Sequence, residues 1–277
     1  MKKINLGNIV VKSLVYLSII ITMSILLLLV GYILIKGVRH INLDLFNFKY
    51  TTENVSLFPS LINTFIITFL TLLFAVPLGV FSAIYLIEYA KKGSKVVKLV
   101  RTTTETLQAI PSIVYGLFGY LFFVKVIFKD YCILAGALTL SIMILPLIMR
   151  TTEEALLSVD NSFREGSFGL GAGKLRTIFK IVLPSASYGI FAGIILAIGR
   201  IVGETAALIY TAGAVSQIPK DLFGSGSSLS IHMYKLWSEG LNSDQAYATA
   251  VIILLIVILM NALSDKLSKK LVKNQGR

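Results

Sequence analysis

The sequence predicts an all-helical integral membrane protein with six transmembrane helices, and its composition and its apolar runs lead to this prediction. Of the 277 residues, 56% are hydrophobic and only 14% are charged. The mean hydropathy of +0.82 lies far from the balance of a soluble domain. Apolar runs long enough to cross a bilayer, which takes about 20 residues, recur along the chain.

The predicted spans are separated by short connections, except where a strongly basic loop at 89–108 follows the second span. The first span is too long for the core of a signal peptide and lacks a small-residue cleavage site, so we expect it to be retained. The second contains Pro77 and Gly79, which membrane helices tolerate. The six spans are expected at about 10–35, 61–87, 110–128, 132–149, 184 to at least 200, and 246–263.

Basic residues are distributed unequally between the two sides of this layout. With a cytoplasmic N-terminus, 18 of the 26 Lys and Arg residues fall in cytoplasmic segments and 7 on the other side, as expected when basic residues stay inside. Residues 1–9 are then a cytoplasmic N-terminus, 10–263 a six-span domain in the lipid bilayer, and 264–277 a basic cytoplasmic tail. The net charge of +12 reflects topology, and we expect no nucleic-acid partner.

The segment 150–184 has the pattern of two helices joined by a glycine turn. Ser162 and Glu165 match a capping box, which predicts a helix beginning at Phe163. Glycines at 169, 171 and 173 break that helix, because glycine turns without steric cost. Apolar and basic residues then recur at helical spacing, as in a helix that lies along a membrane surface and ends at Pro184.

Five residues of this segment are spaced as E-x5-G-x9-I-x-L-P. The segment resembles the EAA loop that permease subunits of bacterial ABC importers present to their ATPase, with Gly166 and Ser167 in place of the usual alanines. The resemblance implies a type I ABC importer permease fold in which 150–184 is the cytoplasmic coupling loop. The ATPase-coupling residues that it implies are Glu165, Gly171, Ile181, Leu183 and Pro184.

The stretch GLGAGK at 169–174 does not match a nucleotide-binding loop. A P-loop needs glycine at 168 and Ser or Thr at 175, where the chain has Phe168 and Leu175. A dinucleotide fingerprint needs glycine at 174, which is Lys174. We therefore expect no cofactor in this chain; the alternative to a coupling role is an ordinary amphipathic loop helix.

Arg200 and Glu204 lie four residues apart in an apolar stretch, and a continuous helix would put both on one face. A charge inside a membrane is normally paired and usually functional; the alternative is a pair that only cancels its own charge. Gly199 and Gly203 flank the pair, and we expect them to let a ligand or another helix come close to the backbone. The guanidinium fork of Arg200 matches a tetrahedral oxyanion. An ionised Glu204 only accepts hydrogen bonds, which favours phosphate, with a proton to donate, over sulfate.

The motif GRIVGETAAL at 199–208, with PSIVYGLFG at 111–119 and EYA at 88–90, resembles the A-type permease subunit of bacterial phosphate importers. The resemblance continues over nearly the whole chain from about residue 63, but Ala207 stands where the family often has proline. It implies a cell-membrane heterodimer with a homologous permease subunit, two copies of an ATPase and an extracytoplasmic phosphate-binding protein. Arg200 would contact phosphate, with Glu204 its neighbour in the pathway.

Two other functions stay open. The same fold could carry sulfate, molybdate or an organic anion. A membrane-embedded enzyme would need a nucleophile, a base or a metal in one pocket, whereas His40 and His232 are expected in loops and Cys132 at the start of a span. We therefore expect a non-catalytic subunit without a metal site, with ATP hydrolysed on the separate ATPase.

Overall fold

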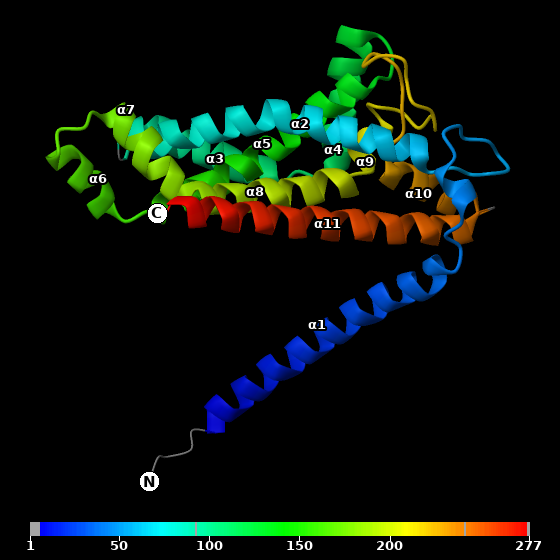
Figure 1. Ribbon diagram of the computed structural model, residues 1–277, viewed down its shortest axis with the longest axis horizontal. Coiled ribbons are helices and arrows are strands. Elements are labelled where there is room, and N and C mark those ends of the chain that lie inside the picture. Colours follow the sequence, from blue (N-terminus) through cyan, green and yellow to red (C-terminus); the bar gives the residue numbers. More distant parts are fainter. Residues whose placement is uncertain (1–5, 92, 241, 276–277) are drawn as a thin grey trace.

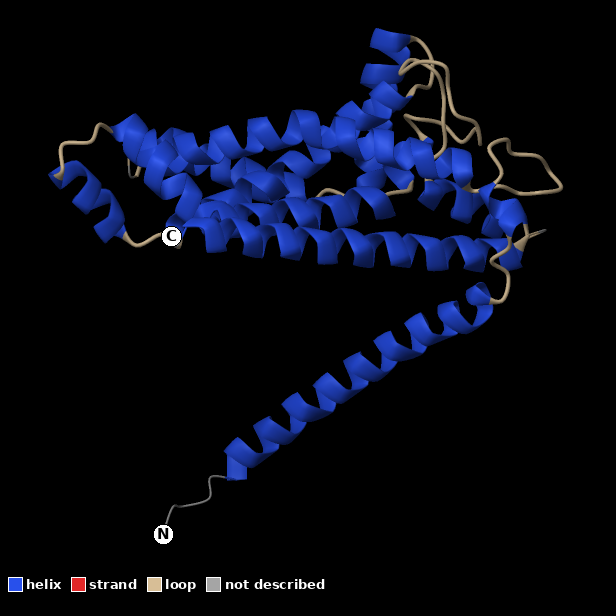
Figure 2. Ribbon diagram, viewed as in Figure 1, coloured by secondary structure: helices blue, strands red, loops and turns tan. Residues whose placement is uncertain are grey.

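The computed structural model describes residues 6–91, 93–240 and 242–275, and its regular structure within these ranges is entirely helical (Figure 2). Within the part of the chain that the structure describes, five helices are long and apolar enough to cross a membrane. A further pair, bent by 100° at its break, makes a sixth crossing if it counts as one span. The five long helices are α1 (Leu6–Val38), α2 (Phe58–Ile84), α5 (Ile133–Leu157), α8 (Leu183–Gly203) and α11 (Ser243–Gln275).

The bent pair occupies the predicted basic loop and the predicted third span. It consists of α3 (Lys95–Ala109), α4 (Ser112–Gly119) and the π-helical segment η3 (Tyr120–Phe128). The prediction of a loop at 89–108 is wrong from residue 95 onward, because Lys95, Lys98 and Arg101 belong to an amphipathic helix whose partly buried valines pack against the bundle. The chain bends at Pro111, which has no amide hydrogen and keeps the preceding residue out of the helical region.

Pro184 does not end a helix. The elements α7 (Lys174–Thr177), η4 (Ile178–Val182) and α8 follow without a break and form one candidate span, Lys174–Gly203. The prediction of a separate surface helix is therefore wrong. The π-helical turn before Pro184 accommodates a residue that has no amide hydrogen to donate. Similarly, α5 continues past the predicted end of its span at 149 to Leu157.

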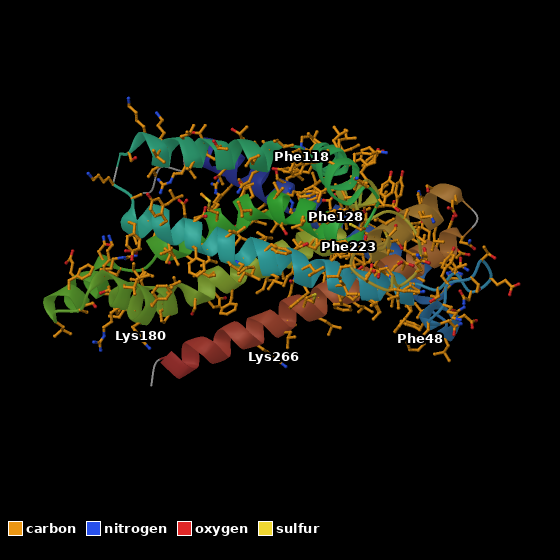
Figure 3. All side chains as sticks on the ribbon, turned by 90° about the horizontal axis from the view of Figure 1, so that it is seen from above. Phe48, Phe118, Phe128, Lys180, Phe223 and Lys266 are labelled. Carbon is orange, nitrogen blue, oxygen red and sulfur yellow. The ribbon has the colours of Figure 1, made fainter. Side chains whose placement is uncertain are left out.

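The two ends of the bundle carry different elements (Figure 1). One end, called the coupling end here, carries α6 (Asn161–Gly169) and α7. The far end carries the loop around η1 (Leu43–Phe46). Lys180 and Phe48 mark these two ends in Figure 3. The shorter elements are η2 (Tyr85–Tyr89), α9 (Ala206–Ile209) and α10 (Leu229–Glu239).

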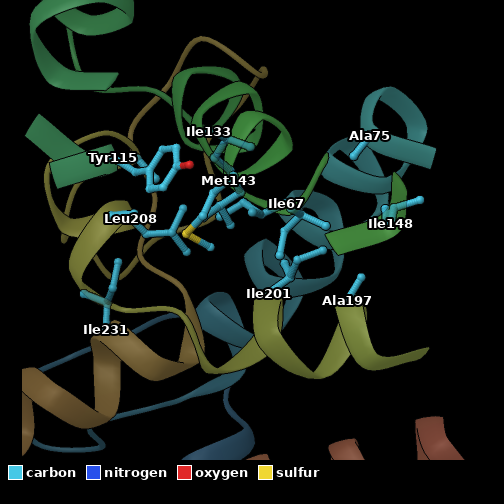
Figure 4. Packing of buried hydrophobic residues seen from close by; sticks show 14 residues of the cluster. Ile67, Ala75, Tyr115, Ile133, Met143, Ile148, Ala197, Ile201, Leu208 and Ile231 are labelled. Atoms are coloured by element: carbon cyan, nitrogen blue, oxygen red, sulfur yellow. The ribbon is translucent and has the colours of Figure 1, made fainter. Parts of the chain in front are cut away.

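The main core lies among α2, α5 and α8 (Figure 4). Ile67 of α2, Ile148 of α5 and Ile201 of α8 are each at most 2% exposed within it. A Cβ atom on Gly79 would lie 2.8 Å from the Ile148 side chain, so α2 and α5 approach more closely there than other residues would allow. This packing fixes the position of Arg200, the neighbour of Ile201.

Helix α1 leans away from the bundle (Figure 1). The side chains from Val10 to Leu29 are exposed along its length. It meets the bundle near its C-terminal end, where Gly37 packs against Tyr247 of α11. An apolar helix of this kind needs lipid or another protein around it.

Candidate functional site

Arg200 lies one turn before the end of α8 and is half-buried. Its side chain lines a cavity of about 590 Å³ between α5, α8 and α11, and among the described residues that line this cavity it is the only charged one. The other lining residues are Leu147, Ala192, Ile195, Leu196, Gly199, Val257 and Asn261. Among the described residues, no carboxylate forms a salt bridge with Arg200. A charge in such surroundings is normally paired, and the described part of the chain offers this half-buried guanidinium no ionic partner.

Glu204 does not share a helical face with Arg200, and this prediction is wrong. Helix α8 ends at Gly203, and Glu204 has extended backbone angles, φ −74° and ψ 128°. Its side-chain Oε1 accepts a hydrogen bond from the amide of Ala207 at 3.1 Å, which satisfies a donor at the start of α9. Its carbonyl oxygen accepts a hydrogen bond from the hydroxyl of Ser230 at 2.6 Å. Glu204 is 9% exposed. Its buried hydrogen bonds with Ala207 and Ser230 fix the chain at the point where α8 ends.

The backbone around the break is open on the side of the two glycines. A Cβ atom on Gly199 or Gly203 would meet no atom of the described residues within 4 Å. The opposite side is closely packed, because a Cβ atom on Gly116 of α4 would lie 2.9 Å from the Cα of Ala207. The expectation that Gly199 and Gly203 leave room for a ligand thus agrees with the structure.

Two glycines hold α8 against α5. A Cβ atom on Gly189 would lie 2.7 Å from the Cβ of Ala155, and one on Gly193 would lie 2.6 Å from the Cβ of Thr151. These pairs repeat every four residues on both helices, which is the small-residue spacing that lets membrane helices approach closely. Arg200 lies on the same helix as these glycines, so this contact sets the distance between its backbone and α5.

A buried polar cluster near the far end was missed in the sequence. The Asn63 amide donates to the carbonyl oxygens of Gln217 and Ser227 at 2.9 and 3.2 Å. The hydroxyls of Ser60 and Ser227 lie 2.7 Å apart. These bonds join α2 to the segment between α9 and α10, which follows the end of α8. In the sequence their only signal was a concentration of Ser, Thr and Asn inside apolar stretches.

His232 was also predicted wrongly, as a loop residue. It lies on α10, is 1% exposed, and packs edge-on against the Tyr50 ring with the ring centroids 5.9 Å apart. Burial, with a smaller contribution from the nearby Lys235, lowers the pKa of His232 to about 4. The side chain is therefore neutral at ordinary pH.

The N-terminus of α6 is capped by Asp160, and the predicted capping box at Ser162 is wrong. The Asp160 side chain accepts from the amide of Ser162 at 2.8 Å, and the helix begins at Asn161. This hydrogen bond holds the pKa of the Asp160 carboxyl below its usual range. The prediction of a helix followed by a glycine turn is nevertheless correct.

Gly171 is the glycine on which the turn depends, with φ +81°. The amide of Gly171 donates to the carbonyl of Phe168 at 2.9 Å, and the amide of Ala172 donates to that of Ser167 at 3.1 Å. These two bonds form a Schellman motif, which needs a left-handed residue at this position. By contrast, Gly173 has φ −71° and begins α7.

The five predicted coupling residues divide into two groups. Glu165 and Gly171 are exposed, whereas Ile181, Leu183 and Pro184 are half-buried in the continuous helix that follows. Large exposed apolar side chains surround the first group, and the basic residues Arg176 and Lys180 lie beside the turn. These apolar residues are Phe163, Phe168, Leu170, Leu175 and Phe179, with Leu170 91% exposed. These exposed apolar side chains, with the basic residues beside the turn, are here called the apolar patch of the coupling end.

Comparison with known proteins places this architecture among transport proteins. A family model described as binding-protein-dependent transport system inner membrane component matches residues 75–273. The chain is similar to the probable ABC transporter permease protein YqgI of Bacillus subtilis, with 34% identity over 273 residues that cover 91% of this chain and 92% of the relative. It is also similar to the phosphate transport system permease protein PstA of Pasteurella multocida, with 34% identity over 230 residues that cover 82% and 81% of the two chains.

A similar fold occurs in the crystal structure of a bacterial alginate ABC transporter in complex with an alginate pentasaccharide-bound periplasmic protein. The TM-score is 0.67 at 17% sequence identity, and the match covers 96% of this chain and 98% of that one. At this identity the likeness concerns the fold alone.

Proposed function

The chain belongs to the family of binding-protein-dependent transport system inner membrane components, and we propose that it is the permease subunit through which an ATP-driven importer moves inorganic phosphate. It is a multi-pass membrane protein with an importer permease fold. The observation that carries the proposal is Arg200, a half-buried guanidinium without an ion-pair partner among the described residues, which lines a cavity between three spans. A relative named for phosphate transport supports the choice of cargo.

The chemistry of the site favours phosphate over sulfate. The Arg200 guanidinium presents a planar set of donors to two oxygens of a tetrahedral anion. The Oε1 atom of Glu204 accepts a hydrogen bond from the amide of Ala207. The Oε2 atom of Glu204 makes no hydrogen bond to the described residues. An ionised Oε2 accepts the proton of hydrogen phosphate and repels sulfate, which has no proton to donate. Arg200 and Glu204 are the substrate-binding residues in this proposal: Arg200 lines the cavity, and Glu204, which lies beyond the described lining of that cavity, is its neighbour along the pathway.

The coupling end receives the ATPase. Glu165 and Gly171 lie within the exposed apolar patch on α6 and its turn, and a separate subunit that binds ATP docks there. When the ATPase moves α6 and its turn, this movement reaches α8 through Ile181, Leu183 and Pro184, which lie in the continuous helix after the turn. The coupling end and both termini are then cytoplasmic, in agreement with the distribution of Lys and Arg.

The rest of the importer consists of a second, homologous permease subunit, two ATPase copies and an extracytoplasmic phosphate-binding protein. Helix α1 leans away from the bundle over most of its length and offers this apolar surface to the second permease subunit and to lipid (Figure 1). The chain itself is non-catalytic and holds no cofactor. Phosphate crosses between the two permease subunits as the spans alternate between outward and inward access.

The test is ATP-dependent uptake of labelled phosphate into proteoliposomes that contain the assembled importer, with binding protein outside and ATP on the ATPase side. Sulfate and molybdate in hundredfold excess serve as competitors. We expect uptake that needs ATP and ignores both competitors. If sulfate or molybdate blocks the uptake, the protein is still an importer subunit, but the proposed cargo is wrong. An assembled complex that takes up no anion would refute the transport function.

A further inference from the structure

A buried ion pair joins the coupling end to the end of the second span. The Nε and Nη2 atoms of Arg164 on α6 donate to Oε1 of Glu88 in η2 at 3.0 and 2.9 Å. The two side chains are only 14% and 8% exposed. The pair Arg150–Glu154, on the surface of α5, is 54% and 65% exposed. Only the first pair is shielded enough from water to hold its geometry firmly.

The same guanidinium also binds the end of the fourth span. Nη2 donates to the carbonyl of Leu156 and Nη1 to the carbonyl of Val159, each at 2.9 Å. Helix α5 ends at Leu157, so its last carbonyls lack helical partners and carry the negative end of the helix dipole. Arg164 therefore connects three elements, α6, α5 and η2, through one planar group.

A second contact reinforces this connection from the other side of the glycine turn. The Nζ atom of Lys174 lies 4.7 Å from the ring centroid of Tyr89, the residue next to Glu88. The buried hydroxyls of Ser167 and Thr177 lie 2.8 Å apart and join α6 to α7. The two helices of the coupling segment are thus fixed to each other and to two consecutive residues of η2.

The residues that receive these contacts lie in a π-helical turn, Tyr85–Tyr89, at the end of α2. An inserted turn of this type changes which side chains face inward and is frequent at functional positions. From there, α2 packs on α5 at Gly79 and Ile148, and α5 packs on α8 at Thr151 and Gly193. A contiguous chain of packed contacts leads to the helix that carries Arg200.

We propose that Arg164 and Glu88 form the joint through which the coupling segment moves α2 and the end of α5. This proposal rests on the proposed function, because it assumes an ATPase that displaces α6. Arg164 acts as a positioning residue and touches neither phosphate nor ATP. With the joint intact, movement of α6 shifts the spans; without it, α6 moves while α2 stays in place.

The test uses the assembled importer in proteoliposomes with Arg164→Gln, Glu88→Gln and, as a matched control, Arg150→Gln. Phosphate uptake and ATP hydrolysis are measured on the same preparation. We expect Arg164→Gln to lower uptake by roughly 2- to 30-fold, which corresponds to the ~0.5–2 kcal/mol by which residues along a coupling path change the coupling, while ATP hydrolysis falls much less than uptake. Arg150→Gln should change neither rate, because its partner and its environment are exposed.

Unchanged uptake in Arg164→Gln, or uptake and ATP hydrolysis that fall in parallel in an intact complex, would overturn the joint. If Arg164→Gln does not assemble, Glu88→Gln decides. Glu88→Gln keeps the size of the side chain and a hydrogen-bond acceptor but removes the charge that pairs with Arg164. We expect it, like Arg164→Gln, to raise the number of ATP molecules hydrolysed per phosphate taken up. An unchanged ratio would overturn the proposal.

A distance measurement separates this proposal from the choice of cargo. Spin labels are placed at Ser162 on α6 and Phe81 on α2, both exposed, in a Cys132→Ala background. In wild type the distance should stay constant between the nucleotide-free and vanadate-trapped states, because the two elements move together. In Arg164→Gln it should change between the states. The same constant distance in both proteins would overturn the joint, even if the wild type carries an anion other than phosphate.

Discussion

Replacing Gly193 by alanine tests the close contact between α8 and α5. A Cβ atom at this position would lie 2.6 Å from the Cβ of Thr151 and closer still to its hydroxyl oxygen. Since carbon atoms pack best at about 3.5–4.0 Å, the two helices must separate by about 1 Å. Overpacking of this size costs about 1–3 kcal/mol, which corresponds to a fall in Tm of roughly 2–12 °C at about 2–4 °C per kcal/mol.

Thermal unfolding of the purified chain in detergent, followed by circular dichroism, measures this effect. Gly199→Ala on the same helix is the control, because its Cβ atom would meet nothing within 4 Å, and its Tm should stay equal or rise slightly with the better helix propensity of alanine. The double variant Gly193→Ala with Thr151→Gly moves the side chain from one helix to the other, and we expect it to regain most of the lost stability. Equal losses in Gly193→Ala and Gly199→Ala, or no loss in the first, would refute the reasoning from close packing.

Two further predictions concern the far end and the coupling end. The folded pKa of His232 is about 4 and the unfolded value about 6.5, so the unfolded chain binds more protons between these values. Stability should therefore be lost as pH falls from about 6.5 to 4, by up to ~3 kcal/mol. His232→Gln should flatten the dependence of Tm on pH in this window, and an equally steep fall would contradict the burial argument. Gly171→Ala places an L-residue at φ +81°, which costs about 1–2 kcal/mol. It should reduce the amount of ATPase that copurifies with the permease, whereas Gly166→Ala, in open space within α6, should retain it; equal yields would argue against a role for the turn.

The spans could be predicted from the sequence because the bilayer requires long apolar segments. Their breaks could not be predicted in the same way. The stretch from Arg200 to Glu204 reads as a continuous helix, and it ends at Gly203 because of distant partners. The Ser230 hydroxyl binds the Glu204 carbonyl, and Gly116 lets α4 approach Ala207. Contacts between residues this far apart in the chain leave no local pattern.

Local sequence patterns were misleading where the same residue types are compatible with two different structures. Asp160 and Ser162 are both good capping residues, and only the backbone conformation selects Asp160. Lys95 and Lys98 suit a polar loop as well as one face of α3. The buried position of His232 depends on Tyr50, which is far away in the chain. By contrast, the glycine turn after α6 could be predicted from the sequence, because it is made by residues that are close together in the chain.

The most direct test of the central claim is phosphate uptake by the assembled importer with Arg200→Gln. Binding of an anion by a charged donor contributes about 1.5–3 kcal/mol, so we expect uptake to fall roughly 10- to 100-fold. The amount of assembled complex should stay unchanged, since no described residue forms an ion pair with Arg200. Uptake at the wild-type rate in a fully assembled Arg200→Gln complex would contradict the account and remove the cavity beside Arg200 from the phosphate pathway.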